Sequence, residues 1–133
     1  MKIVIDCNVI ISAGLTKGTC RQVLLSVLDN HTLIVSEPIL EEWACVIQRE
    51  KFSAHRPYLE TLLLSLCQLG TLVKPTSQPF LLPDKDDEKY LEAAQAGNAT
   101  ILITGNKKHF PESLYGETRI MAPAEYHVQY VEP

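Results

Sequence analysis

The sequence lacks the features that define several common classes of protein. Its four cysteines form no C-x-x-C pair and its four histidines form no H-x-x-x-H pair, so no redox motif or zinc site of these kinds is predicted. The longest later apolar stretch, TLLLSLCQLG, is too short to span a bilayer. The net charge of −4 gives no overall electrostatic attraction to nucleic acid, so any such binding needs a local basic patch.

The N-terminal segment MKIVIDCNVI is no signal peptide, because Asp6 and Asn8 interrupt its apolar stretch and no small-residue cleavage site follows. We therefore expect a cytoplasmic protein that does not bind membranes. A content of 46% apolar and 21% charged residues is typical of a soluble globular protein, and the length predicts a single domain over residues 1–133. The cysteines have mostly apolar neighbours and are expected to be buried, reduced thiols.

Apolar periodicity predicts strands that alternate with helices. Strands are expected at residues 2–5, 32–36, 71–74, 99–105 and 118–123, and helices at 18–30, 38–51, 58–70, 86–98 and 124–131. Residues 75–86 contain three prolines and are predicted to form a loop. This alternation predicts an α/β fold, a three-layer αβα sandwich with a central parallel sheet.

Asp6 directly follows the first predicted strand, whose residues IVI are strongly apolar. In an open α/β sheet, ligands bind in the crevice beyond the carboxyl ends of the strands, so we expect Asp6 to point into this crevice. An alternative role for Asp6 is to cap the following turn.

Helical geometry selects one glutamate from the pair in LEEW. Ile39, Trp43 and Val46 lie on one apolar face of the predicted helix. Glu41 lies nearly opposite this face and should be solvated, whereas Glu42 lies at its edge. Glu42 is therefore the better candidate for chemistry.

The stretch DKDDEK contains four acidic residues at a helix start. They could simply complement the helix dipole. However, Asp87 shares a helix face with Tyr90 and Ala94, whereas Asp84 or Asp86 is better placed to cap the helix. An inward carboxylate requires a partner, so Asp87 is the acid that we select.

Asp6, Glu42 and Asp87 are far apart in the sequence but are expected to meet at one crevice, where Asn106 also follows a buried strand. Neighbouring carboxylates repel one another, and a hard divalent cation would offset this repulsion. Ligands that are all oxygen atoms favour Mg²⁺ or Mn²⁺.

Three segments, VIDCNVIISA, SEPILEEWACVIQREKF and DKDDEKYLEAAQAGNATILITGNKKHF, resemble the PIN domain family, the nuclease fold of VapC-type toxins. The resemblance covers nearly the whole chain and implies a PIN-like, Rossmann-like sandwich. Matched position by position, it assigns Asp6, Glu42 and Asp87 as catalytic metal ligands and Asn106 as the fourth ligand. The family has aspartate where this chain has Asn106, which weakens the metal site; Asp84 is a candidate replacement carboxylate.

The resemblance implies a metal-dependent endoribonuclease that cleaves single-stranded RNA, the toxin of a type II toxin–antitoxin pair, with an antitoxin as partner and a homodimer as the common assembly. Polar neighbours are expected to orient Asp6, and basic residues at the rim to contact phosphate. The orienting residues are Asn8, Ser12 and Thr104, and the basic residues are Lys107, Lys108 and His109. These basic residues could equally belong to a solvated loop that does not bind phosphate.

Two other functions stay open. A PIN module weakened by Asn106 could bind RNA or a partner protein without cleaving. In a phosphatase or phosphoacceptor domain, Asp6 itself would be the nucleophile; the haloacid-dehalogenase type requires a second aspartate two residues later, where this chain has Asn8.

Overall fold

The computed structural model describes residues 1–75, 80 and 82–132. Its elements, in chain order, are β1 (Lys2–Ile5), α1 (Cys7–Leu15), α2 (Thr19–Asn30), β2 (Thr32–Ser36), α3 (Glu37–Val46), η1 (Glu50–His55), α4 (Arg56–Leu69), β3 (Thr71–Val73), η2 (Lys85–Asp87), α5 (Glu88–Ala96), β4 (Ile101–Ile103), η3 (Lys107–His109), β5 (Leu114–Tyr115), β6 (Thr118–Met121), α6 (Pro123–Tyr126) and η4 (His127–Val131).

The sheet has the strand order β3-β2-β1-β4-β6-β5. Every neighbouring pair is parallel except β5 and β6, which form an antiparallel hairpin at one edge. The first strand of the chain therefore lies inside the sheet, where Ile3 pairs with Leu33 of β2 and with Ile101 of β4. The predicted α/β fold with a mostly parallel central sheet is confirmed, and the antiparallel edge is an addition to it.

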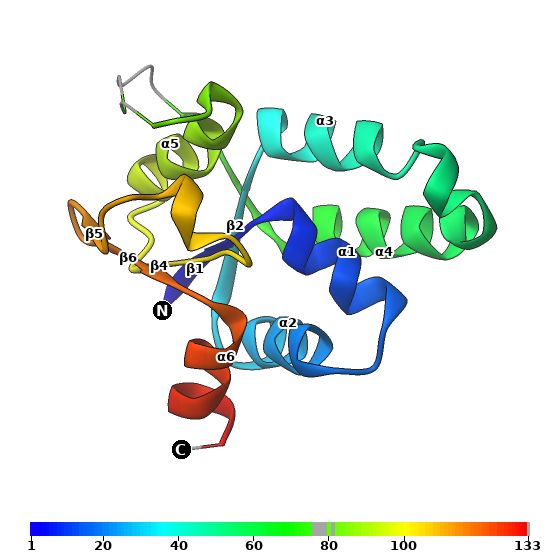
Figure 1. The fold of residues 1–133 in the computed structure, drawn as a ribbon, viewed down its shortest axis with the longest axis horizontal. Helices are drawn as coiled ribbons and strands as arrows, with labels where there is room; N and C mark the ends of the chain where they lie inside the picture. Colours follow the sequence, from blue (N-terminus) through cyan, green and yellow to red (C-terminus); the bar gives the residue numbers. More distant parts are fainter. Residues whose placement is uncertain (76–79, 81, 133) are drawn as a thin grey trace.

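Helices cover the sheet on both faces. Helix α5 packs against β1, β2 and β4, while α2 and α6 pack together on the other side (Figure 1). Helices α1, α3 and α4 contact one another and extend beside the sheet (Figure 1). The three layers place α1, α3 and α5 around the carboxyl ends of the central strands.

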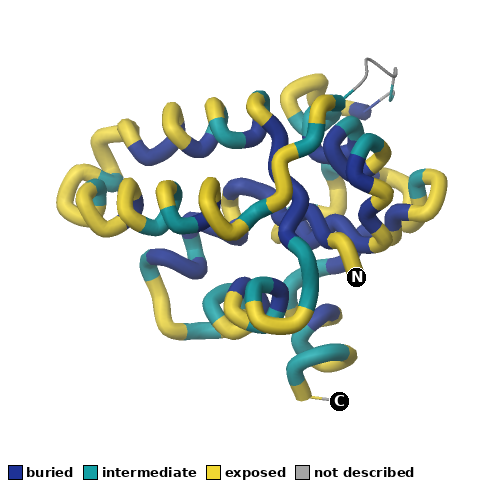
Figure 2. The backbone as a smooth tube through the Cα atoms, turned by 180° about the vertical axis from the view of Figure 1, so that it is seen from behind, coloured by how far each residue is buried: buried dark blue, intermediate teal, exposed yellow. Residues whose placement is uncertain are grey.

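The core is centred on β1 and β4. Ile3, Val4 and Leu102 are fully buried, as expected for strands covered on both faces. Figure 2 shows buried backbone through the middle of the molecule and exposed residues on the outer turns of the helices. Burial of each such large apolar side chain stabilises the fold by about 1.5–3 kcal/mol, so the strand that ends at Asp6 is held rigidly.

Besides the added strand β5 and shifted ends of other elements, three differences from the predicted elements are informative. The helix expected at 38–51 ends at Val46, and the Arg56 side chain donates hydrogen bonds to the carbonyls of Ile47 and Gln48 beyond it, as a helix C-terminus requires. The helix α1 was not predicted, since residues 7–15 are apolar on most sides and show no amphipathic period. The helix expected at 86–98 begins as the short turn η2.

Other expectations have mixed outcomes. All four cysteines are free thiols, but Cys45 and Cys67 are exposed, so the expectation of buried thiols is wrong for these two. Residues 76–79 and 81 of the loop predicted at 75–86 lie outside the described residues, and its last two residues begin the short turn η2. Within the described ranges, no helix combines the length and the apolar character needed to cross a membrane.

Candidate functional site

Asp6 lies at the carboxyl end of β1 and is only 6% exposed. Its Oδ1 accepts a hydrogen bond from the backbone N–H of Asn8 at 3.3 Å, which caps α1, and its Oδ2 accepts one from the Thr104 hydroxyl at 2.8 Å. Burial raises the pKa of Asp6, the two hydrogen bonds oppose this effect, and the charge of Glu42 adds to it. Asp6 therefore caps α1 and places a largely buried carboxylate, whose charged form burial disfavours, at the end of β1.

The acidic cluster before α5 divides into a capping acid and an inward acid. Asp84 caps η2 by accepting a hydrogen bond from the Asp86 N–H at 3.0 Å, and Asp86 is exposed. The side chain of Asp87 is only 13% exposed. Burial raises the pKa of Asp87 to about 6, the charge of His109 opposes this, and the charges of Asp6, Asp84 and Glu42 add to it.

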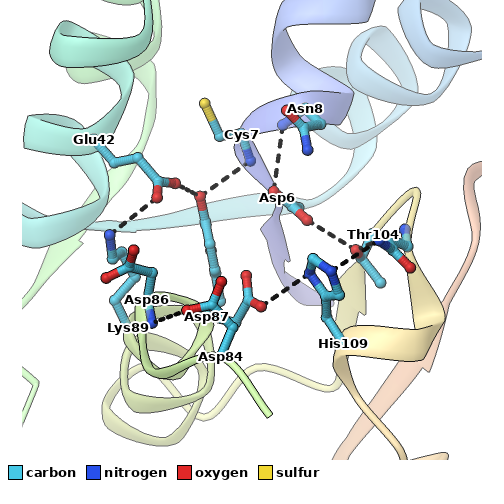
Figure 3. A network of polar contacts seen from close by, with 12 residues as sticks. Asp6, Cys7, Asn8, Glu42, Asp84, Asp86, Asp87, Lys89, Thr104 and His109 are labelled. Carbon is cyan, nitrogen blue, oxygen red and sulfur yellow. Dashed lines mark hydrogen bonds and ion pairs between the residues drawn. The ribbon is translucent and has the colours of Figure 1, made fainter. Parts of the chain in front are cut away.

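His109 joins the two sides of the crevice. Its Nδ1 lies 3.0 Å from Oδ2 of Asp87 (Figure 3). Its Nε2 lies 2.9 Å from Nδ2 of Asn106. The backbone N–H of Asn106 donates to the Thr104 hydroxyl at 3.1 Å. The Asp87 Oδ2 atom is shielded from water and receives no hydrogen bond within the described residues, so its contact with His109 is an ion pair without hydrogen-bond geometry.

Glu42 projects from α3 but is engaged by α5. The Tyr90 hydroxyl donates a hydrogen bond to Glu42 Oε1, and Lys89 Nζ forms an ion pair with Oε2 at 3.0 Å. The same hydroxyl accepts a hydrogen bond from the backbone N–H of Cys7 at 3.2 Å. Figure 3 shows the Glu42 carboxylate directed toward Lys89. Through its two hydrogen bonds, Tyr90 connects α3, α5 and the start of α1.

The expected convergence of three carboxylates is therefore incomplete. The charge of Glu42 raises the pKa of both Asp6 and Asp87, and the charge of Asp6 also raises the pKa of Asp87, so the three lie in one electrostatic neighbourhood. Within residues 1–75, 80 and 82–132, however, no three acidic, histidine or cysteine side chains stand close enough to hold a metal ion. The Glu42 carboxylate is instead held by Lys89 and Tyr90.

The donors nevertheless suit a hard cation. Asp6 and Asp87 supply two largely buried carboxylates, and one oxygen of Asp87 is shielded without a hydrogen bond. Mg²⁺-type sites in proteins often use only one or two carboxylates, completed by water and substrate phosphate. The residues present thus fit a divalent cation at this crevice.

The remaining predicted residues take different positions. Thr104 contacts Asp6 through its side chain, whereas Asn8 does so through its backbone N–H, and its side chain is exposed. Within the described residues, Ser12 takes part in hydrogen bonding through its backbone carbonyl, which accepts from the N–H and the hydroxyl of Thr16. Lys107 pairs with Glu125 at 2.8 Å, and Lys108 is exposed at the rim.

Sequence reasoning did not anticipate the roles of two α5 residues. Tyr90 was assigned to the apolar face, and Lys89 was not singled out. A signal for Tyr90 was present, because it follows Asp87 by three residues and shares its helix face, while its hydroxyl requires a partner when buried. Nothing in the sequence pairs Lys89 with Glu42, since 47 residues separate them.

The strand order and the acidic crevice define a Rossmann-like αβα domain with a candidate cation site at the carboxyl edge of its sheet. Comparison with family models matches residues 2–108 to the PIN domain. The chain therefore belongs to the PIN domain family.

A solved structure supports the fold independently. The chain is similar to the crystal structure of VapBC2 from Rickettsia felis bound to a DNA fragment from their promoter, with 17% sequence identity and a TM-score of 0.65. The match covers 92% of this chain and 98% of the other. No curated protein sequence matches the chain.

Proposed function

We propose that this PIN domain is a metal-dependent endoribonuclease that cleaves single-stranded RNA. The observation that carries the proposal is the pair Asp6 and Asp87, two largely buried carboxylates with raised pKa values at the carboxyl edge of a parallel sheet. Their burial is unfavourable in the free protein, and a bound cation would offset it. Membership of the PIN family, whose domains are generally metal-dependent nucleases, supports the same conclusion.

The chain's own residues divide the work. Asp6 and Asp87 hold Mg²⁺ or Mn²⁺, with Asp84 as a further candidate carboxylate, and the Thr104 hydroxyl and the N–H of Asn8 fix the orientation of Asp6. The bound metal supplies a more acidic water and positive charge at the scissile phosphate.

Glu42 joins this set when its carboxylate leaves Lys89, and it then acts as the third acid. The ion pair is about one-fifth exposed, so substrate phosphate can compete for the Lys89 ammonium. Lys107 and Lys108, at the rim after β4, are proposed to contact the RNA backbone.

An antitoxin protein is the proposed partner, as in a type II toxin–antitoxin pair. The support is the similarity in fold to a VapBC2 complex, a toxin–antitoxin assembly. A homodimer in the cytoplasm is proposed as the form that binds this partner. Exposed apolar residues of α4 and β3, among them Leu64, Leu69 and Leu72, are available for such contacts.

The direct test is cleavage of a labelled single-stranded RNA in the presence of Mg²⁺ or Mn²⁺, compared with EDTA. Asp6→Asn and Asp87→Asn should each abolish metal-dependent cleavage, whereas the matched control Asp86→Asn should retain it. If Asp86→Asn abolished cleavage and Asp87→Asn did not, the assignment of the essential acid would be wrong. If the wild type bound RNA without cleaving it, a weakened PIN module would be the better description. The feature that favours this alternative is the uncharged amide of Asn106 where the family has aspartate.

A further inference from the structure

We propose that His109 is a metal ligand, and that its imidazole takes the place of the carboxylate that the family pattern has at position 106. This inference rests on the proposed metal-dependent function and specifies the metal that the site accepts. His109 and Asp87 would form the core of a mixed nitrogen and oxygen site, with Asp6 completing it. Such a site favours a first-row transition metal such as Mn²⁺ or Co²⁺ over Mg²⁺.

The contact between His109 and Asp87 has the dimensions of a shared metal ion. Nδ1 and Oδ2 lie 3.0 Å apart, yet Oδ2 receives no hydrogen bond within the described residues. Two neighbouring ligands of an octahedral ion, with bonds of about 2.1 Å, lie about 3 Å from each other. Both atoms can therefore bind the same ion with little movement of either side chain.

Asn106 is placed to orient the imidazole. In the structure its Nδ2 lies 2.9 Å from Nε2 of His109, so the amide donates to Nε2, while its backbone N–H donates to the Thr104 hydroxyl. A metal-binding histidine usually donates its second ring N–H to an oxygen acceptor. Metal binding at Nδ1 requires the other tautomer: the Asn106 amide turns over so that Oδ1 accepts from Nε2–H, and the lone pair of Nδ1 is then free toward the Asp87 side of the crevice.

The position of His109 suits a ligand rather than a purely structural residue. Its side chain is 41% exposed, so it can exchange with solvent ions, and its charge acts on both Asp6 and Asp87. The other histidines, His31, His55 and His127, have no acidic partner among the ion pairs of the described residues. His109 is thus the histidine that the fold brings to the two carboxylates.

Pulsed EPR of bound Mn²⁺ tests the inference directly, because it detects the nitrogen of a coordinated imidazole. The experiment uses the full chain without a histidine tag. We expect nitrogen coupling in the wild type and in His55→Asn, a matched control for an exposed histidine elsewhere. His109→Asn should lose the coupling and bind Mn²⁺ at least about tenfold more weakly in calorimetry, while it stays folded in EDTA with a melting temperature lowered only slightly by loss of the ion pair with Asp87.

The outcomes separate this inference from the proposed function. Mn²⁺ bound without nitrogen coupling, and lost in Asp6→Asn, would overturn the role of His109 and leave the carboxylate site intact. A wild type that bound Mg²⁺ as tightly as Mn²⁺ and Co²⁺ would also overturn it. A wild type that bound none of these ions would overturn both. If His109→Asn did not fold, His109→Phe would be measured by the same two methods.

Discussion

Replacement of Asp87 by asparagine should stabilise the metal-free protein at neutral pH. The wild-type carboxylate is charged there although it is only 13% exposed and lies near Asp6, Asp84 and Glu42. Asparagine has nearly the same shape and carries no charge. A residue that only complemented the dipole of α5 would behave in the opposite way, because its replacement would remove a favourable charge from the first turn.

The size of the effect follows from the pKa of Asp87. Folding raises it from 3.8 to about 6, and each pKa unit corresponds to about 1.4 kcal/mol, which gives an upper limit of about 3 kcal/mol. Solvent at the rim screens part of this cost, and the substitution also removes the ion pair with the half-exposed His109. We expect a net gain of about 1 kcal/mol, or about 3–4 °C in melting temperature.

The sign of the pH dependence provides a second readout. The pKa of Asp87 is higher in the folded than in the unfolded protein, so the folded protein binds its proton more tightly. The carboxyl group therefore begins to lower the free energy of unfolding as the pH rises above about 4, and this loss is complete above about 6. The advantage of Asp87→Asn over the wild type should therefore be full at pH 7 and vanish near pH 4.

The assay is urea unfolding in EDTA at both pH values. The matched control Asp86→Asn should change the free energy of unfolding by less than about 0.5 kcal/mol. A loss of stability in Asp87→Asn at pH 7 would refute the reasoning.

Three further changes test other contacts. Tyr90→Phe should lower the free energy of unfolding by about 1–3 kcal/mol, because it leaves a buried N–H at the start of α1 unpaired, and should release Glu42. Asn106→Asp should tighten Mn²⁺ binding in calorimetry, since it adds a negative charge beside the carboxylates. Gly97→Ala should lower the melting temperature, because its new Cβ would lie 2.8 Å from a methyl carbon of Ile34.

Each change has a control and a contrary outcome. Tyr58→Phe alters an exposed tyrosine of α4 and should be neutral in urea unfolding; an equal loss there would remove the argument for Tyr90. Unchanged Mn²⁺ affinity in Asn106→Asp would show that this side chain points away from the ion. Gly105→Ala, where the added Cβ meets no neighbour within 4 Å, is the control for Gly97, and equal melting of the two variants would contradict the predicted clash.

The sequence predicted those parts of the fold that depend on local patterns. Continuous apolar runs such as IVI and ILI are typical of buried parallel strands, and the strands lie where these runs predict. The helix α1 was not predicted because its apolar residues lie on most of its sides and leave no amphipathic pattern in the sequence. Its burial comes from packing against α2 and α4. The early end of α3 likewise involves the Arg56 side chain, which binds the carbonyl of Ile47 from beyond the helix and is not part of the helical pattern.

The candidate site could be predicted only in outline. Strand ends and helix faces place Asp6, Glu42 and Asp87 near one crevice, because these positions follow from backbone geometry. The partners of each carboxylate depend on side-chain packing between distant elements. Glu42 binds Lys89 and Tyr90 across the gap between α3 and α5, and this contact, invisible in the sequence, determines which acids face the crevice in the free protein.

The central place of β1 in the sheet has a consequence for how the protein is made. Along the chain β1 precedes β4, yet β1 gains its second neighbour in the sheet only when β4 is present, and Thr104, which donates a hydrogen bond to Asp6, lies 98 positions after it. Pairing over such a long stretch of chain is slow and late in folding. During synthesis, the crevice around Asp6 can therefore assemble only after the segment that carries β4 and Thr104 has left the ribosome.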